Sequence, residues 1–447
     1  MGYDPQFQQR IFEMLQESQY WPEQQMRSFQ QQQLAQLLTF AREQVPFYRD
    51  RLEVVFTKDG KLDWANWNKV PILKREDIMK YSEEMYPAEI PDGHGYVSDH
   101  FGTGSTGKPI TTRHNSLVPL VSDAGLFRAF DWHGVNYNKV RCTIDGDDPK
   151  IGSWPEGLEL GAWSPNWMAN QSAGKLLQIN RNASPEEIAE FLFRKSVSYL
   201  TGIPNRMHSI ALASEKLNLK TKLDKIITLS EAPSDVFRED CRRIFGADII
   251  SNYSSKEVYN IAHQCKSGIH YHVNSEMVLL EVLDENDQPC ANGQVGRSIV
   301  TSFFNTAQPL IRYDLGDQII MGEACSCGRT LPVIAKIAGR TSHLFRFPGG
   351  RSVLLSLRTS FFKIIAAKGW QIAQTAPLHL EVRYVPDGTP NRPDFEALTS
   401  ILRLRTDQRV TVSYRLVTAL PLTAAGKFIW WQCSIQFFFV PQQLTIG

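Results

Sequence analysis

The chain has 447 residues, enough for two or three domains, and its 42% hydrophobic and 21% charged residues are typical of a globular protein. A net charge of +1 excludes the strongly basic surface of many proteins that bind nucleic acid or acidic membranes. The apolar runs are short, and the first residues lack a basic segment followed by an apolar block, so neither a membrane span nor a secretory signal is expected. Seven scattered cysteines indicate a reducing compartment, and we predict a cytoplasmic protein.

The predicted elements change in character along the chain. Residues 5–53 carry apolar side chains at helical spacing, which predicts one or two amphipathic helices that end before Pro46. From about residue 95 to residue 340, strand-like runs mix with helical segments, which predicts an α/β body. Within it, residues 278–302 read as strand, polar turn and strand, the pattern of a hairpin. Near Gly339 the pattern breaks and predicts a boundary to a smaller domain.

The segment FGTGSTGKPI, residues 101–110, comes close to the P-loop pattern G-x-x-x-x-G-K. A P-loop continues with Ser or Thr on a helix, but here Pro109 follows Lys108 and disfavours a helix at this point. Glycine N–H groups, two hydroxyls and a lysine can still hold phosphate in a loop between strands. A flexible linker is the other reading of the segment taken alone.

Later segments follow this one in an order that resembles the adenylate-forming superfamily, which includes acyl-CoA synthetases and nonribosomal adenylation domains. They are YSSKE at 253–257, IRYDLGD at 311–317, AGR at 338–340 and PLTAAGKF at 421–428. The pieces FAREQVPFYRDRL, VPILKREDI, TGIPNRM and CSCGRT resemble the phenylacetate–CoA ligase branch and its capsule-biosynthesis relatives. The resemblance covers roughly residues 30–430, and its specificity lies in the order of the motifs.

The resemblance implies an α/β fold with a large N-terminal AMP-binding domain over 1–340 and a small, mobile α+β domain over 341–447. It implies ATP-dependent activation of a small or aryl carboxylic acid as an acyl-adenylate, followed by transfer to coenzyme A. No residue identifies a tunnel for coenzyme A, so transfer to an amine, which would give an amide, stays open. A non-catalytic nucleotide-binding relative is a third hypothesis. The oligomeric state, a homodimer included, stays open.

The resemblance also implies roles for single residues. The β- and γ-phosphates of ATP would be held by Ser105, Thr106, Gly107 and Lys108. Ser230 and Glu231 would line the adenine pocket, and Tyr253 would stack on the adenine ring. Asp317 would bind the ribose hydroxyls, with Arg340 nearby. Glu257 would bind Mg²⁺, a cation that prefers oxygen ligands, and Lys427 would stabilise the forming acyl-adenylate. The alternatives are a surface turn for Lys427, a structural loop for Asp317 and an ion pair for Arg340.

Two departures from the family pattern concern the catalytic segment and the hinge. Lys256 stands where the family has Thr or Ser before the glutamate, and Ser254 replaces a glycine. Lys256 has two readings, a catalytic one in which it supplies charge to the α-phosphate and one in which it points to solvent. Ser342 replaces the acidic residue that is common after G-R in this branch, which leaves the hinge behaviour open.

A second cluster of chemistry-bearing residues lies in HQCKSGIHYH and CSC. Thiolates and imidazoles suit tetrahedral Zn²⁺, and a closed set of four ligands would be structural. We predict Cys265, His270, Cys325 and Cys327 as ligands, a pattern that also resembles some members of the branch. His272 competes with His270, because residues two apart lie on the same side of a strand. Unliganded reduced cysteines are the alternative.

Overall fold

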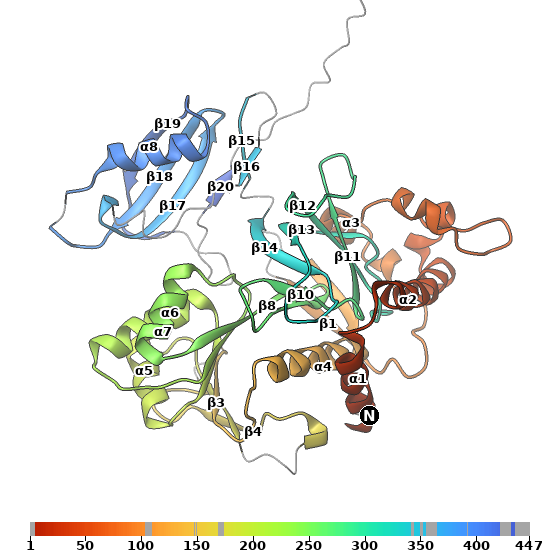
Figure 1. Ribbon diagram of the computed structural model, residues 1–447, viewed down its shortest axis with the longest axis horizontal. Coiled ribbons are helices and arrows are strands. Elements are labelled where there is room, and N and C mark those ends of the chain that lie inside the picture. Colours follow the sequence, from red (N-terminus) through yellow and green to blue (C-terminus); the bar gives the residue numbers. More distant parts are fainter. Residues whose placement is uncertain are drawn as a thin grey trace, which may run out of the picture. The chain divides into compact units, whose positions relative to one another are not determined.

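The computed structural model describes residues 5–102, 110–146, 148, 150–168, 174–340, 344–348, 352–354, 364–390, 392–420 and 431–433. The chain divides into two compact units, the larger one ending at Ala338 and the smaller one starting at Gly339 (Figure 1). The predicted α/β class, with a large sheet-rich part and a smaller C-terminal part, is confirmed. The predicted domain boundary after residue 340 stays a prediction.

The helices and strands of the larger unit follow the predicted alternation. Its α-helices are α1 Pro5–Ser18, α2 Glu23–Gln44, α3 Arg75–Lys80, α4 Leu117–Trp132, α5 Pro185–Arg194, α6 Pro204–Lys216 and α7 Asp235–Phe245. Its first strands are β1 Val97–Gly102, β2 Ile110–Asn115, β3 Arg141–Ile144, β4 Leu158–Ala162, β5 Lys175–Ile179, β6 Tyr199–Gly202 and β7 Lys225–Thr228. The later strands are β8 Asp248–Ser255, β9 Tyr259–Gln264, β10 Tyr271–Val273, β11 Val278–Leu283, β12 Val295–Ser302, β13 Tyr313–Gly322 and β14 Val333–Arg340. The predicted N-terminal helices and the hairpin of β11 and β12 are confirmed.

A sheet of 12 strands runs through this unit in the order β11-β12-β13-β14-β10-β9-β8-β7-β6-β3-β5-β4. Its centre, from β8 to β5, is parallel, and the pairs at both ends are antiparallel. Successive side chains of a strand point to opposite faces, so Leu200 and Ile226 pack under α5, α6 and α7, whereas Tyr199 and Ile227 pack with Phe130 of α4 (Figure 1). The parallel strands are therefore covered on both faces, and α4 lies on the face opposite to α5–α7.

Local signals set the ends of the covering helices. Ser184 and Glu187 form a reciprocal capping box at the start of α5, next to Pro185 in the first turn. Ser234 caps α7, and Gly246 ends it with a φ of 70°, a left-handed conformation that glycine adopts at low cost. These caps fix where the helices stop and the loops at the strand ends begin.

The smaller unit has a four-stranded sheet in the order β19-β18-β17-β20 and one described α-helix. Its elements are β15 Leu344–Arg346, β16 Ser352–Leu354, β17 Ala367–Ala376, β18 His379–Pro386, α8 Phe395–Arg405, β19 Thr411–Leu416 and β20 Trp431–Cys433. Leu398 and Leu402 of α8 pack on Leu380 and Val382 of β18, which gives this unit a hydrophobic core of its own.

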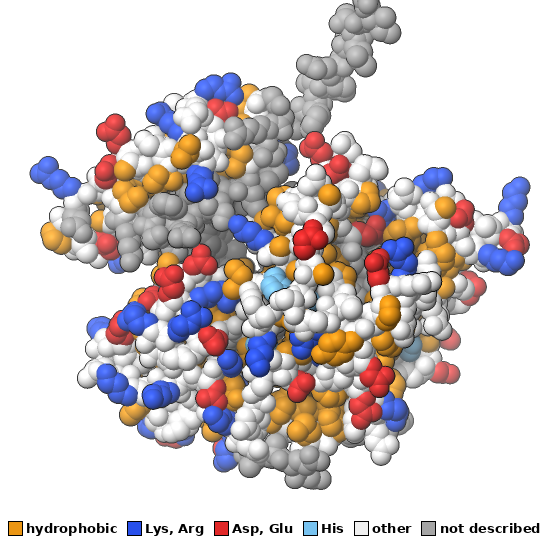
Figure 2. Space-filling view, in the orientation of Figure 1, with side chains coloured by type: hydrophobic (Ala, Val, Ile, Leu, Met, Phe, Trp, Pro, Cys, Tyr) orange, Lys and Arg blue, Asp and Glu red, His pale blue; other side chains and the backbone are white. Residues whose placement is uncertain are grey.

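The described surface agrees with the near-neutral net charge. Figure 2 shows Lys and Arg side chains interspersed with Asp and Glu, rather than one large patch of a single sign. None of the described helices is long and apolar enough to cross a membrane.

Candidate active site

The glycine-rich segment lies between two paired strands. Strands β1 and β2 are antiparallel, with Gly102 opposite Ile110, so the prediction that strands flank this segment is confirmed. Residues 103–109, which include the predicted phosphate-binding residues Ser105, Thr106, Gly107 and Lys108, lie outside the described residues, as do Ser342 and Lys427.

Lys256 contacts this hairpin at the point where β1 enters the glycine-rich segment. Its Nζ donates a hydrogen bond of 2.9 Å to the carbonyl oxygen of Phe101, the next-to-last residue of β1. The rings of Tyr259 and His114 also meet, with centroids 5.2 Å apart, which ties β2 to the start of β9. Lys256 of the YSSKE segment and Tyr259, two residues after that segment, therefore contact β1 and β2 of the glycine hairpin respectively, although more than a hundred residues separate them in sequence. The hydrogen bond of Lys256 to Phe101 differs from both arrangements considered from the sequence, a contact with the α-phosphate and a side chain directed to solvent.

Tyr253 and Asp317 meet across the curled end of the sheet. The Tyr253 hydroxyl donates a hydrogen bond of 2.9 Å to Asp317 Oδ2, and it lies 3.0 Å from the hydroxyl of Ser298. Three strands separate β8 from β13 in the sheet order, so the sheet must curl for these side chains to touch. Tyr253 is buried, and its predicted stacking on adenine and the predicted ribose contact of Asp317 stay predictions.

Glu257 lies in the turn after β8 and faces a cation. Its Oε1 is 3.5 Å from Nη1 of Arg75, and both side chains are largely buried. Sequence reasoning gave Arg75 no role, although this first residue of α3 lies within the quoted segment VPILKREDI. One carboxylate suits Mg²⁺ only when phosphate oxygens and water complete the shell, because Mg²⁺ requires near-octahedral coordination.

The remaining nucleotide-binding candidates lie at strand ends. Ser230 and Glu231 follow β7 at its carboxyl end, next to the parallel strand β8 that carries Tyr253. Ligands of open α/β sheets commonly bind at this edge. Ser230 has a φ of 67°, and Glu231 Oε2 accepts a hydrogen bond of 2.9 Å from Asn205. Arg340 is the last residue of β14, on the smaller-unit side of the division.

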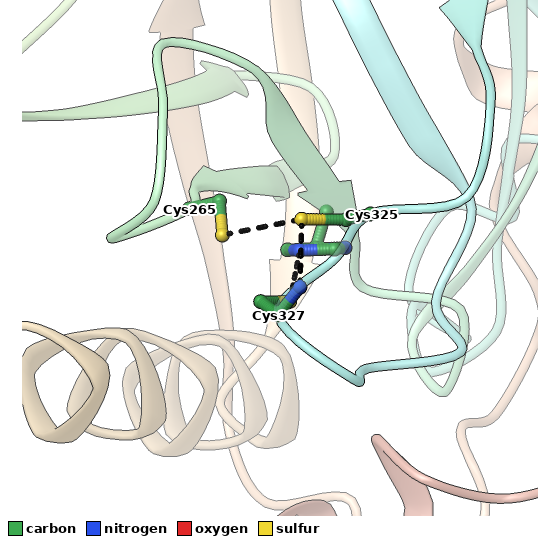
Figure 3. A group of neighbouring side chains, drawn as sticks. Cys265, Cys325 and Cys327 are labelled. Atoms are coloured by element: carbon green, nitrogen blue, oxygen red, sulfur yellow. Dashed lines mark hydrogen bonds between the residues drawn. The ribbon is translucent and has the colours of Figure 1, made fainter.

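The cysteine cluster gathers at one end of β9, β10, β13 and β14. The ligand atoms of Cys265, His272, Cys325 and Cys327 all lie within 4.8 Å of one another. Figure 3 shows the sulfur atoms of Cys265 and Cys325 facing each other, and they are 3.8 Å apart. The Cys327 sulfur is 3.3 Å from His272 Nε2. Tetrahedral zinc, with Zn–S of about 2.3 Å and Zn–N of about 2.0 Å, places its ligand atoms about 3.5–3.8 Å apart. The residues present therefore fit this metal.

His272 is oriented as a metal ligand, whereas His270 lies beside one sulfur of the cluster. His272 Nδ1 is 3.3 Å from the carbonyl oxygen of Leu331, so a proton on Nδ1 leaves Nε2 free for a metal. Burial lowers the pKa of His272 to about 4, which keeps the ring neutral. His270 Nε2 is 3.0 Å from Cys325 but does not belong to the group of four. The geometry thus favours His272, the competing ligand in the sequence prediction.

No family model matches the chain. It is 23% identical to a phenylacetate–coenzyme A ligase of Thermus thermophilus over 342 residues, which are 73% of each protein. It is also 23% identical to the CapK protein of Staphylococcus aureus over 300 residues, 65% of this chain and 62% of that one.

Solved structures share the fold. A 2-hydroxyisobutyryl-CoA ligase in its postadenylation state matches with a TM-score of 0.65 and 18% identity, over 90% of this chain and 89% of that one. An amide bond synthetase, McbA of Marinactinospora thermotolerans, matches with a TM-score of 0.52 and 16% identity, over 74% of this chain and 67% of that one. In motif order, relatives and fold the chain is therefore similar to the adenylate-forming superfamily, and among its members to the phenylacetate–CoA ligase-like branch.

Proposed function

We propose that the protein is an AMP-forming ligase that activates a carboxylic acid with ATP and passes the acyl group to coenzyme A. In the first step a carboxylate oxygen attacks the α-phosphorus of ATP, and the bond to pyrophosphate breaks. In the second step the thiol sulfur attacks the acyl carbon, AMP leaves and the thiol proton is released. The observation that carries this proposal is the contact of Lys256, the neighbour of Glu257, with the end of β1 where the glycine-rich segment begins.

The chain's own residues would divide the work as follows. Tyr253 and Asp317, joined by their hydrogen bond, would bind the nucleoside, and the glycine segment would bind the outer phosphates. Glu257 would hold Mg²⁺, which supplies positive charge against the phosphates when it is bound. Lys427 would approach the α-phosphate and the acyl oxygen and stabilise the negative charge that develops there.

The acceptor is the open part of the reaction. The phenylacetate–coenzyme A ligase and the 2-hydroxyisobutyryl-CoA ligase favour coenzyme A, and the fold shared with McbA keeps an amine acceptor as the alternative. Supplying the adenylated acid with coenzyme A or with amines, and weighing the product by mass spectrometry, distinguishes a thioester from an amide. ATP binding without pyrophosphate release on a broad acid panel would favour a non-catalytic relative.

The group of Cys265, His272, Cys325 and Cys327 would hold a structural zinc ion. The metal would join the segment after β9, strand β10 and the loop between β13 and β14. His270 remains the rival fourth ligand.

Lys427→Ala is expected to lower acyl-adenylate formation about 100-fold, because one preorganised donor at a developing charge contributes about that much. Hydroxamate trapping of the adenylate over a panel of acids measures this effect. Lys58→Ala, at an exposed lysine of the larger unit, is the control and is expected to match the wild type. Unchanged trapping in Lys427→Ala would remove the assigned role.

Lys256→Met is expected to raise the KM for ATP about 3- to 10-fold and to leave the KM for the acid unchanged. The reason is that the variant loses a charged hydrogen bond that positions the glycine hairpin. The expected effect is modest, because Lys256 is exposed and an exposed hydrogen bond contributes less free energy than a buried one. Steady-state kinetics with each substrate varied in turn measures the split, and Lys256→Arg is expected to restore the KM for ATP. Equal changes in both KM values would contradict a positioning role.

A further inference from the structure

Tyr259 has a backbone conformation that is unusual for a large side chain. It is the first residue of β9 and pairs with Ser255, the last residue of β8, across the three-residue turn 256–258. Its φ is 60°, in the left-handed region that glycine adopts at low cost and that crowds the Cβ atom of any other residue. A bulky residue that is kept in this conformation is often part of a functional site.

The side chain of Tyr259 lines a cavity beside the candidate active site. The cavity has a volume of about 10 Å³, room for about one water molecule. Val258, Tyr259 and Asn260 all line it, and they directly follow Glu257, the predicted magnesium ligand. The ring of Tyr259 also lies 5.2 Å from that of His114, measured between centroids. Tyr259 therefore contacts both the cavity and β2, the strand that follows the glycine-rich segment.

The other walls of the cavity are mostly apolar. Their apolar side chains are those of Val118, Val121, Val258, Met277, Val278 and Phe304. The polar side chains of Ser122 and Asn260 are paired with each other, since Asn260 Nδ2 donates a hydrogen bond of 2.8 Å to Ser122 Oγ. Apolar walls and polar groups that are already paired favour a hydrocarbon group in the cavity over a charged one.

Met277 forms the wall of the cavity next to α4. Its side chain packs so closely on Gly125 that a Cβ atom at Gly125 would lie 2.7 Å from the terminal methyl carbon of Met277. Gly125 lies one helical turn after Val121 and Ser122, which line the cavity on the same helix. The cavity is therefore bounded by a closely packed methionine on one side and by the strained Tyr259 on another.

We infer that this cavity receives the hydrocarbon group of the acid, and that the side chain of Tyr259 limits the substrate to a short aliphatic acid such as acetate or propionate. A cavity that holds a benzene ring measures about 150 Å³, so an aromatic acid would overlap with the walls, Tyr259 among them. A role in limiting the size of the acid also gives a reason for a large residue at a position where glycine has less strain. This inference rests on the proposed function, since it names the class of acid that is activated.

The test compares acids of increasing size: acetate, propionate, butyrate, hexanoate, benzoate and phenylacetate. ATP-dependent pyrophosphate release gives kcat/KM for each acid. For the wild type, kcat/KM with propionate is expected to exceed that with benzoate by about 100-fold or more, because a group that overfills a packed site must displace its walls.

Tyr259→Gly removes the wall and the backbone strain together. It is expected to raise kcat/KM with benzoate about 10- to 100-fold and to lower kcat/KM with propionate, which loses its contact with the ring. Glycine adopts a φ of 60° at low cost, so the variant is expected to fold.

Three further variants separate the size of the side chain from the backbone strain. Tyr259→Phe keeps the ring and is expected to keep the wild-type ratio of propionate to benzoate. Met277→Ala enlarges another wall and is expected to raise kcat/KM with butyrate relative to propionate about 10-fold. Asn218→Gly is the matched control, because the exposed Asn218, two residues after α6, also has a left-handed φ, of 53°. Its substrate ratio is expected to equal that of the wild type.

The outcomes separate the role of Tyr259 from the ligase function. A wild type that prefers benzoate or phenylacetate, or a Tyr259→Gly variant with an unchanged substrate ratio, would overturn the role of Tyr259 while the ligase function stands. If no acid releases pyrophosphate, calorimetric titration with propionate and benzoate decides. Propionate binding by the wild type, with benzoate binding gained in Tyr259→Gly, supports the cavity assignment without the reaction. Propionate binding without that gain overturns the role of Tyr259, and no binding of either acid overturns both proposals.

Discussion

Removing the proposed zinc ligand Cys327 by a Cys327→Ser substitution is expected to abolish metal binding and to lower the thermal midpoint by about 10 °C or more. The ligand atoms come from three separate segments, and the loop from 323 to 332 that carries two of them contributes few buried apolar side chains. Without the metal the order of that loop would rest on a few hydrogen bonds, and structural zinc contributes about 10–16 kcal/mol to the folding of small zinc domains. Metal analysis of the purified protein and differential scanning calorimetry measure the two effects.

The histidine variants decide the fourth ligand. His272→Ala is expected to lose the zinc ion, and His270→Ala to keep it, because His272 belongs to the group of four and is oriented by Leu331. Metal content is the decisive measurement, since His272 is buried beside Trp132 and its removal also leaves a cavity. Zinc lost from His270→Ala and kept in His272→Ala would reinstate His270, the first choice from sequence. A fully folded protein without metal would refute the site.

The choice between these two histidines shows what the sequence could not decide. Residues two apart share one side of a strand, so periodicity treats His270 and His272 as equivalent. Their difference is tertiary: His272 lies in the interior against Trp132, a residue of α4 that is more than a hundred positions away. The grouping of the three cysteines was predictable, because three cysteines in two short segments are a local signal.

In the candidate active site, too, the sequence predicted the residues that lie in motifs but not the tertiary contacts of other residues. The order of the motifs pointed to Tyr253 and Asp317, and they are hydrogen-bonded although three strands of the sheet lie between β8 and β13. Arg75 was given no role from the sequence, although VPILKREDI contains it, because a single charged residue in a helix usually lies on a solvated face. Its environment depends on how α3 packs, which no local pattern encodes.

Substitution of the buried ion pair between Arg128 and Glu276 is expected to have a large effect on the stability of the protein. Arg128 Nη1 and Glu276 Oε1 are 2.6 Å apart, and the side chains are 0% and 1% exposed. Arg128 also donates to the Leu15 carbonyl oxygen and to Asn274 Oδ1, each at 3.0 Å, and Ser18 donates to Glu276 at 2.5 Å. The pair therefore joins α1, α4 and the segment after β10, the strand of His272.

Glu276→Gln and Arg128→Met are each expected to lower the free energy of unfolding of the larger unit by about 3–5 kcal/mol, because each leaves one buried charge without its partner. The double variant Arg128→Met/Glu276→Met is expected to recover most of this loss, since it removes both charges from the interior. Urea unfolding gives the values, and Arg27→Met, which breaks the exposed pair with Glu23, is expected to change stability by less than about 0.5 kcal/mol. A double variant as unstable as the single ones would show that the hydrogen bonds of Arg128 to Leu15 and Asn274, rather than the pairing of charges, hold α1 in place.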